Sequence, residues 1–304
     1  MSAEGGTKAI VAALLANTGI AISKFVAAGI TGSASMLAEG VHSVADASNQ
    51  VLLLIGGKAS RKAASPAHPF GYGRERYIYA FIVSIVLFSI GGVYALYEGY
   101  HKLSHHGELT TPLVAVIVLV VAIILESFSL RTAVKESNAV RGKQSWVQFI
   151  KGSRSPELPV ILLEDIGALV GLVLALFGVG LSWITGNIVF DALGTLSIGV
   201  LLVLIAIVLA IEIRSMLIGE SATLEDIDAI KAAINEGDEN SLIHLKTLHV
   251  GPDELLVAAK IGIGHSETGE QVAAEIDAAE ARIRAAVPKA KLIYIEPDIP
   301  RAGA

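Results

Sequence analysis

A histidine and an aspartate that could bind a metal lie four residues apart in a long apolar stretch of this chain. His42 and Asp46 fall within SASMLAEGVHSVADASNQ, residues 33–50. On a helix, this spacing puts both side chains on one face, a turn apart. Ionisable groups inside a bilayer-spanning helix are costly and usually mark an ion or substrate path. We therefore interpret the pair as half of a tetrahedral site for a divalent metal.

Two adjacent carboxylates, Glu164 and Asp165, stand at the start of another apolar stretch. On a helix their side chains point about 100° apart, so they cannot both face the same neighbour. Gly167 and Gly171 follow in a GxxxG step, which lets another helix approach closely. A close partner helix that carried the histidine–aspartate pair would bring these groups near the carboxylates.

This approach would give three metal ligands, namely His42, Asp46 and Asp165. Glu164, Asn49 or a water could complete a four-fold coordination. Two plainer interpretations remain open at this point. A buried His–Asp pair can be a structural hydrogen bond only, and Asp165 could lie among the lipid headgroups.

Composition favours a membrane protein and limits the possible ligands. The chain has 304 residues, of which 53% are hydrophobic and 17% are charged, and its mean hydropathy is +0.63. Soluble domains carry about 25% charged residues, so several membrane spans are the better expectation. The net charge of −6 argues against nucleic acid as a partner. Because there is no cysteine, any metal must be held by imidazole and oxygen.

Six apolar stretches can each cross a bilayer: residues 9–30, 34–57, 78–100, 113–133, 158–182 and 188–217. The loops after the second and the fourth stretch are rich in lysine and arginine, whereas the other connections carry almost none. By the positive-inside rule the two basic loops are cytoplasmic, and so are both termini.

The remainder of the chain has the composition of a small soluble domain. We therefore predict a transmembrane domain at 1–218 and a C-terminal domain at 219–304. Thr223 and Asp226 form a capping-box pattern before a helix, and Val272 to Ile283 follow helical periodicity. Strands are predicted at 242–250, 255–263 and 291–296. This α-β-β-α-β unit of about 85 residues has little core of its own, so we expect it to support a homodimer.

Four segments together resemble the cation diffusion facilitator family of divalent-metal transporters. They are GSASMLAEGVHSVADASNQ, HPFGYGRERYIYAF, LLEDIGALVGLVLALFG and ITGNIVFDALGTLSIG. The LLED sequence and the segments after it look most like the zinc transporter 9 branch. The resemblance implies a six-span α-helical homodimer in the lipid bilayer, with a cytoplasmic metallochaperone-like α+β domain. It also implies export of Zn²⁺, as substrate rather than cofactor, in exchange for protons.

Residue by residue, His42, Asp46 and Asp165 match three of the four positions of the family's usual transport site. The fourth, usually a histidine, falls at Ile161, so Glu164 is our candidate for the missing ligand. An oxygen-rich site would also admit Mn²⁺, Fe²⁺ or Co²⁺.

Two accessory metal sites of some relatives are incomplete in this sequence. After the second span, His68 is retained but the partner position is Tyr72. By our alignment, the positions of the binuclear site in the C-terminal domain hold no histidine or carboxylate; they are Ile243, Lys260, Ala273 and Ile295. We therefore predict that this domain dimerises without a tight binuclear metal centre.

Two more ionisable residues lie deep in predicted spans. Lys24, in the first, could snorkel to the interface or pair with a carboxylate. Glu126, in the fourth, needs a partner, and a structural hydrogen bond and a proton relay are equally compatible with its position.

The sequence thus predicts a metal/proton antiporter that works by alternating access. Protons compete with the metal for His42 and the carboxylates, so a more acidic outside would release the ion. One alternative is a membrane-anchored metal-sensing scaffold, and another is a pure channel, whose flux would not depend on the pH difference. An enzyme is not expected, because no nucleophile–base pair is found. Without a targeting extension, the expected location is a bacterial inner membrane.

Overall fold

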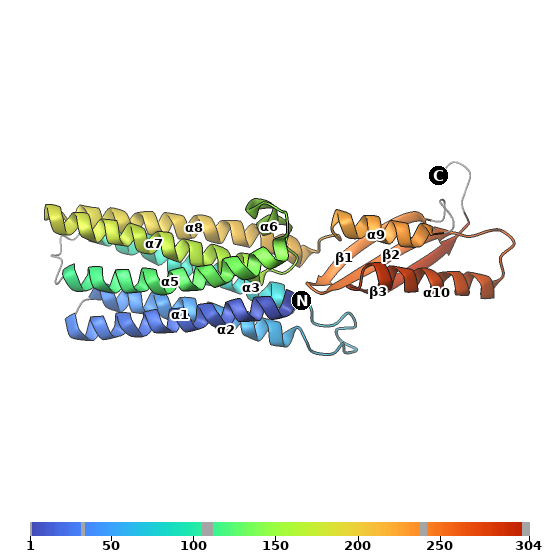
Figure 1. Cartoon of the computed structure of the whole chain (residues 1–304), viewed down its shortest axis with the longest axis horizontal. Coiled ribbons are helices and arrows are strands. Elements are labelled where there is room, and N and C mark those ends of the chain that lie inside the picture. The colour runs from blue at the N-terminus through green and yellow to red at the C-terminus, as the bar shows by residue number, and fades with distance from the viewer. Residues whose placement is uncertain (1, 32–33, 105–111, 237–241, 300–304) are drawn as a thin grey trace. The chain divides into compact units, whose positions relative to one another are not determined.

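The computed structural model describes residues 2–31, 34–104, 112–236 and 242–299 (Figure 1). Within these ranges, the side chains of residues 2–9, 27–28, 30–42 and 88 lie outside the described part. The chain divides into two compact units. One contains residues 1–59 and 76–214, and the other contains residues 60–75 and 215–304.

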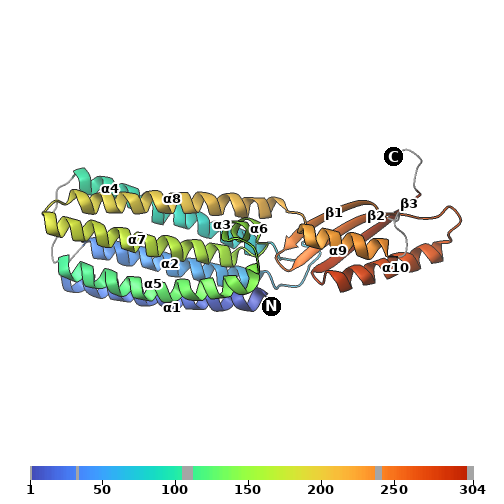
Figure 2. The ribbon, with the colours of Figure 1, turned by 45° about the horizontal axis from the view of Figure 1, so that its top comes forward.

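The first unit is a bundle of long helices. These are α1 (Ser2–Thr31), α2 (Ala34–Ala59), α5 (Pro112–Arg141), α7 (Glu157–Thr185) and α8 (Val189–Ile218), whose last residues belong to the second unit. A further long helix consists of α3 (Glu75–Val86), the π-helical segment η1 (Leu87–Val93) and α4 (Tyr94–Ser104). Helix α1 packs against α2 and α5, and α5 packs against α7 (Figure 2).

All six predicted spans are helical in the structure. Four helices in the described part are long and apolar enough to cross a membrane: Glu75–Ser104, Pro112–Arg141, Glu157–Thr185 and Val189–Ile218. Ile10–Val26 forms a shorter apolar helical segment. The short helix α6 (Trp146–Gly152), which we did not predict, begins with a capping box between Ser145 and Gln148.

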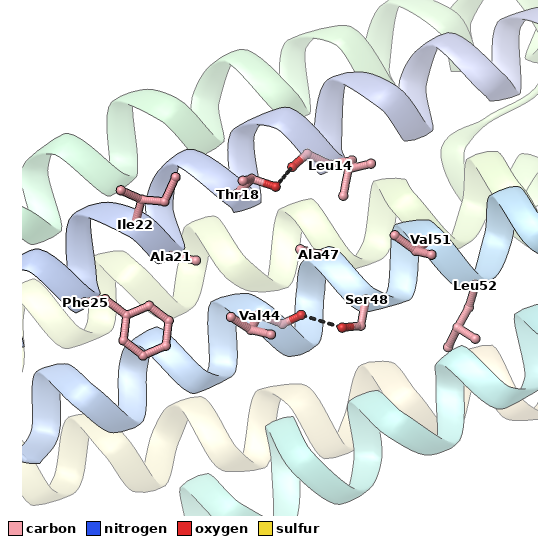
Figure 3. Close-up of a pocket in the computed structure, with 10 residues that line it drawn as sticks. All are labelled: Leu14, Thr18, Ala21, Ile22, Phe25, Val44, Ala47, Ser48, Val51 and Leu52. Atoms are coloured by element: carbon pink, nitrogen blue, oxygen red, sulfur yellow. Dashed lines mark hydrogen bonds between the residues drawn. The ribbon is translucent and has the colours of Figure 1, made fainter.

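The outer side of the α1–α2 pair is apolar. An open groove of about 500 Å³ lies there, lined by aliphatic and aromatic side chains that include Phe25 (Figure 3). Its two hydroxyl groups bond their own helices, because Thr18 Oγ1 donates to the Leu14 carbonyl and Ser48 Oγ to the Val44 carbonyl, both at 2.7 Å. This face therefore offers hydrocarbon a surface without unsatisfied hydroxyl donors.

The second unit contains α9 (Leu224–Asn235), β1 (Leu242–Gly251), β2 (Glu254–Gly262), α10 (Gly269–Ala286) and β3 (Ala290–Asp298). This is the predicted order of elements. The sheet order is β1-β2-β3, with β1 antiparallel and β3 parallel to β2. Alternate residues of β2, from Leu255 to Ile261, are buried in one core with residues of α9 and α10. Both helices therefore cover the same face of the sheet.

The N-terminus of α9 is held by a charged network. Thr223 Oγ1 accepts a hydrogen bond from the Asp226 amide, as the capping pattern predicted. Burial raises the pKa of Asp226, but hydrogen bonds from Lys289 and Thr223 outweigh it, so the net pKa is lowered. Lys289 Nζ lies 2.6 Å from Asp226 Oδ2. This ion pair ties α9 to the segment just before β3.

The loop of residues 60–75 packs on the β1–β2 hairpin within the second unit. A Cβ atom on Gly73 would lie 2.8 Å from the Val250 carbonyl oxygen and 2.9 Å from Gly251 Cα. Only glycine permits this backbone approach. In the same loop, the ring centroids of His68 and Tyr72 are 4.6 Å apart and the ring planes are tilted by 37°. Tyr72, at the incomplete metal position, therefore contacts the histidine.

We expect Gly73→Ala to weaken the hold of this loop on the hairpin, because neither backbone atom can move aside as a flexible side chain would. Overpacking of this kind costs about 1–3 kcal/mol. Hydrogen–deuterium exchange of the full-length protein should show faster exchange around residues 250–254. Gly57→Ala is the matched control, because a Cβ there meets nothing within 4 Å. Equal exchange rates of residues 250–254 in the two variants would contradict this interpretation of Gly73.

Candidate metal site

Glu164 joins α7 to α2 through two amide side chains. Asn49 Nδ2 donates to Glu164 Oε1 at 2.8 Å, and Gln50 Nε2 donates to Oε2 at 3.0 Å. The side-chain oxygen of Gln50, Oε1, in turn accepts a hydrogen bond from Asn17 Nδ2 of α1 at 3.2 Å. All four side chains are buried. A continuous polar network therefore runs through the bundle across three helices.

Asp165 faces another neighbour. Its Oδ2 accepts a hydrogen bond from Ser129 Oγ of α5 at 2.9 Å, and the residue is 1% exposed. Glu126 lies one turn earlier on α5 and is also buried. The two adjacent carboxyls of α7 thus diverge as their helical spacing predicts, with Glu164 towards α2 and Asp165 towards α5.

Four carboxyl groups interact electrostatically in the interior of the bundle: Asp46, Glu126, Glu164 and Asp165. None is more than 9% exposed. Like charges at such depth repel strongly, and each loses the hydration that water would provide. A group of this kind is stable only with added cations or protons.

Two oxygens of this network remain open. Among the described residues, Asp165 Oδ1 and Asn49 Oδ1 are buried atoms with no hydrogen-bond partner. Leaving a buried acceptor unsatisfied is costly, and such atoms call for a functional explanation. A carboxylate oxygen and an amide oxygen are both suitable ligands for a divalent cation. The chemistry of the interior therefore fits a metal as a bound species.

The predicted ligand set is seen only in part. His42 belongs to α2, but its side chain lies outside the described residues. In the described part of the chain, no three histidine, aspartate or glutamate side chains lie close enough to hold one metal ion. The assignment of His42, Asp46, Asp165 and Glu164 as ligands stays a prediction.

The glycine face of α7 packs against α8. Gly167 and Gly171 approach α8, where a Cβ on Gly167 would lie 2.6 Å from Ile205 Cδ1 and one on Gly171 would lie 3.5 Å from Ile198 Cγ2. Helix α2 instead meets α7 through Glu164. The physical reason is that small residues favour close packing with any apolar partner, whereas the carboxylate requires hydrogen-bond donors.

Near the start of α7, an ion pair fixes the helix to the neighbouring α3. Arg76 binds Glu157 through both Nε and Nη2, the latter 2.9 Å from Oε2. Tyr77, which is fully buried, donates to the Arg154 carbonyl oxygen at 3.1 Å. Bidentate arginine–carboxylate pairs restrict geometry strongly. These contacts help to position α7, which carries the two inner carboxyls.

Comparison with known proteins identifies the family. Residues 10–218 match the family described as cation efflux transmembrane domain. This chain belongs to the cation diffusion facilitator family. The human mitochondrial protein named proton-coupled zinc antiporter SLC30A9 is 32% identical over 261 residues, covering 85% of this chain and 46% of the human protein.

Two further relatives of this cation diffusion facilitator come from other kinds of organism. Metal tolerance protein C4 of Arabidopsis thaliana is 29% identical over 257 residues, covering 84% of this chain and 56% of the plant protein. Magnetosome protein MamB of Magnetospira sp. strain QH-2 is 25% identical over 244 residues, covering 79% of this chain and 78% of MamB. The predicted family and its zinc transporter 9 branch are thus confirmed, although the chain spans only about half the length of SLC30A9 and metal tolerance protein C4.

Membership of this family makes the chain a multi-pass membrane protein. The four long apolar helices are consistent with it. At the position where the resemblance expects a histidine, Ile161 is fully buried and apolar, one turn before Asp165. An isoleucine side chain can supply no ligand to a metal.

Sequence reasoning missed three members of the polar network, namely Asn17, Gln50 and Ser129. Ser129 is a single polar residue between apolar neighbours, whereas Asn17 and Gln50 each stand beside another polar residue, and an uncharged side chain is a weak signal by itself. Ser129 could have been found because it lies three residues after Glu126 and therefore on the same helical face. Gln50 could not, because only the packing of α2 against α7 reveals its bond to Glu164.

We expect Ser129→Ala to weaken metal binding by about tenfold or more, because loss of a residue that orients a ligand commonly has this effect. The measurement is a Zn²⁺ titration of the purified full-length protein. Ser127→Ala is the control, because Ser127 is exposed and bonds only the Ile123 carbonyl of its own helix. An equal loss of affinity in both variants would show that Ser129 has no special relation to the site.

Proposed function

We propose that this protein exports Zn²⁺ in exchange for protons. The observation that carries the proposal is the set of four mutually interacting, buried carboxyls with two open oxygens in a cation efflux bundle. Relatives named as proton-coupled zinc antiporters support the choice of ion and of counter-ion.

The proposed ligands are His42 and Asp46 on α2 and Asp165 on α7, with Glu164 or Asn49 as the fourth. Support comes from the contact between α2 and α7 at Glu164. Each Glu164 oxygen accepts one amide hydrogen bond and keeps a further lone pair for a metal or a proton. The two amides also fix the direction in which this carboxylate points.

Proton coupling follows from the ligands themselves. A metal binds the neutral form of imidazole and the ionised form of a carboxyl, so binding releases protons from these groups. When alternating access exposes the site to a more acidic side, protons return to the same atoms and the metal leaves. The exchange then needs no proton path separate from the metal path.

The proposal extends to the topology and assembly of the chain. We infer six spans, because α1 and α2 are also long enough to cross a bilayer. The basic loops after the second and fourth helices favour a cytoplasmic location for them and for both termini. We further propose a homodimer in a cell inner membrane, whose C-terminal unit supports dimerisation without a cofactor.

Other functions receive less support. Mn²⁺, Fe²⁺ or Co²⁺ would suit an oxygen-rich site, and Ile161 in place of a histidine favours such a set. A membrane-anchored metal-sensing scaffold would give no reason for desolvated carboxyls deep in the bundle. An enzyme is disfavoured because the family is one of transporters.

We expect Zn²⁺ uptake into proteoliposomes to rise when their interior is made acidic, and to vanish in Asp46→Ala and Asp165→Ala. The physical reason is that each variant removes an anionic ligand from a site where no water can replace it cheaply. Ion flux is followed with an entrapped indicator, and size-exclusion chromatography checks that each variant remains folded.

Mn²⁺ is measured in parallel. Flux of Mn²⁺ alone would retain the exchange mechanism and replace the substrate. Zn²⁺ flux at the wild-type rate in either aspartate variant would rule out the proposed ligands. Absence of flux for both ions, in a folded protein, would favour the scaffold.

A labelling experiment tests the six-span topology. The chain has no cysteine, so single cysteines can be introduced without removing others. We expect Ala64→Cys, in the exposed loop after α2, to react with a membrane-impermeant maleimide only when the cytoplasmic side is accessible. Ser104→Cys, at the exposed end of α4, should react from the opposite side. Labelling of both positions from one side would contradict the topology.

A further inference from the structure

Lys24 places a positive charge in the interior of the helix bundle. The residue is only 3% exposed, and its Nζ donates to Ser43 Oγ of α2 at 3.0 Å. Lysine is almost never buried unless its charge is paired, and in a bilayer it normally extends to the interface. The side chain therefore turns inward, and the snorkelling alternative for Lys24 is wrong.

Lys24 shares a cavity with Asp46, which is a proposed metal ligand, and with Glu126. The cavity has a volume of about 50 Å³. Its lining includes Lys24, Ser43, Asp46, Glu126 and Gly171. Lys24 also interacts electrostatically with Glu126. Among residues whose burial is described, Lys24 is the only buried lysine or arginine.

The positive charge of Lys24 affects how strongly the buried carboxyls can attract a metal ion. Four carboxyls and one ammonium share an interior from which water is largely excluded. A divalent ion that enters must interact with the same carboxyls that the ammonium already stabilises. Since like charges repel strongly at low dielectric, the bound metal and the ammonium oppose each other.

We propose that Lys24 is a tethered counter-cation of the transport site. Its ammonium stabilises Asp46 and Glu126 between transport cycles, and a divalent ion displaces it from them on binding. The lysine thereby lowers metal affinity and promotes release of the ion. This inference rests on the proposed function, and it assigns α1 a direct part in setting the affinity.

Lys24→Met tests the proposal, because it removes the charge and keeps most of the length and the apolar stem. Zn²⁺ and Mn²⁺ affinities of the full-length protein are measured by calorimetric titration at one fixed pH. We expect binding to tighten by about tenfold or more, as the loss of a like charge from a buried site predicts. Metal flux in proteoliposomes should become slower at saturating metal, because release is impeded.

Three variants separate charge from structure. Lys24→Arg keeps the charge and should not tighten binding. Ser43→Ala removes the bond between α1 and α2 while leaving the charge, and should not tighten it either. Lys102→Met removes a lysine that pairs with Asp191 at 3.2 Å, and neither residue lines this cavity. It should leave the affinity unchanged.

A double variant keeps the proposal testable if Lys24→Met does not fold. Lys24→Met combined with Glu126→Gln removes the ammonium together with one carboxyl of the same cavity. Glu126→Gln alone should weaken binding by about tenfold, and the added Lys24→Met should restore most of that loss.

Unchanged or weaker affinity in Lys24→Met, or no restoration in the double variant, would overturn the role of Lys24. If Asp46→Ala abolished flux while Lys24→Met left affinity unchanged, the proposed function would stand without this inference. If the folded wild-type protein bound neither Zn²⁺ nor Mn²⁺, both proposals would fail together.

Discussion

The burial of four interacting carboxyl groups is the constraint on which the rest of the helix bundle depends. Asp46, Glu126, Glu164 and Asp165 come from three helices and are all withdrawn from water. Burying an unpaired carboxylate is among the most costly events in folding. The surrounding amides, hydroxyl and ammonium are therefore conditions for the bundle to form at all. The same groups leave two oxygens open, and these make the interior receptive to a cation.

Helices α1 and α2 each face a polar interior on one side and an apolar groove on the other. On α1, Asn17 faces the polar network, whereas Thr18 faces the apolar groove and bonds only its own helix. On α2, Gln50 and Ser48 divide in the same way. Because each helix has one polar and one apolar side, rotation about its axis would expose amides to hydrocarbon. The network thus fixes helix orientation as well as ligand position.

Much of this architecture follows from periodicity alone, but the pairing of the helices does not. Long apolar runs locate the helices, and alternation along β2 locates the sheet and its buried face. The divergence of Glu164 and Asp165 follows from helical geometry. In contrast, the GxxxG step at Gly167 indicates only that some helix comes close. A glycine pattern carries no information on which neighbour occupies the space, and α8 fills it with Ile205. The hydrogen bond of Gln50 to Glu164 can be identified only once the packing of α2 against α7 is known.

The ligand chemistry also bears on how a transport site differs from a storage site. A site rich in imidazole would hold Zn²⁺ tightly, and Ile161 removes one possible imidazole from α7. Oxygen ligands bind more weakly, and they are also the atoms that protons occupy on the acidic side. A cation that must leave in every cycle benefits from both effects. Under the proposed function, isoleucine in place of the expected histidine would weaken binding of the ion and favour its release. In its proposed role the buried lysine would act in the same direction, because its charge would oppose the ion that the carboxyls attract.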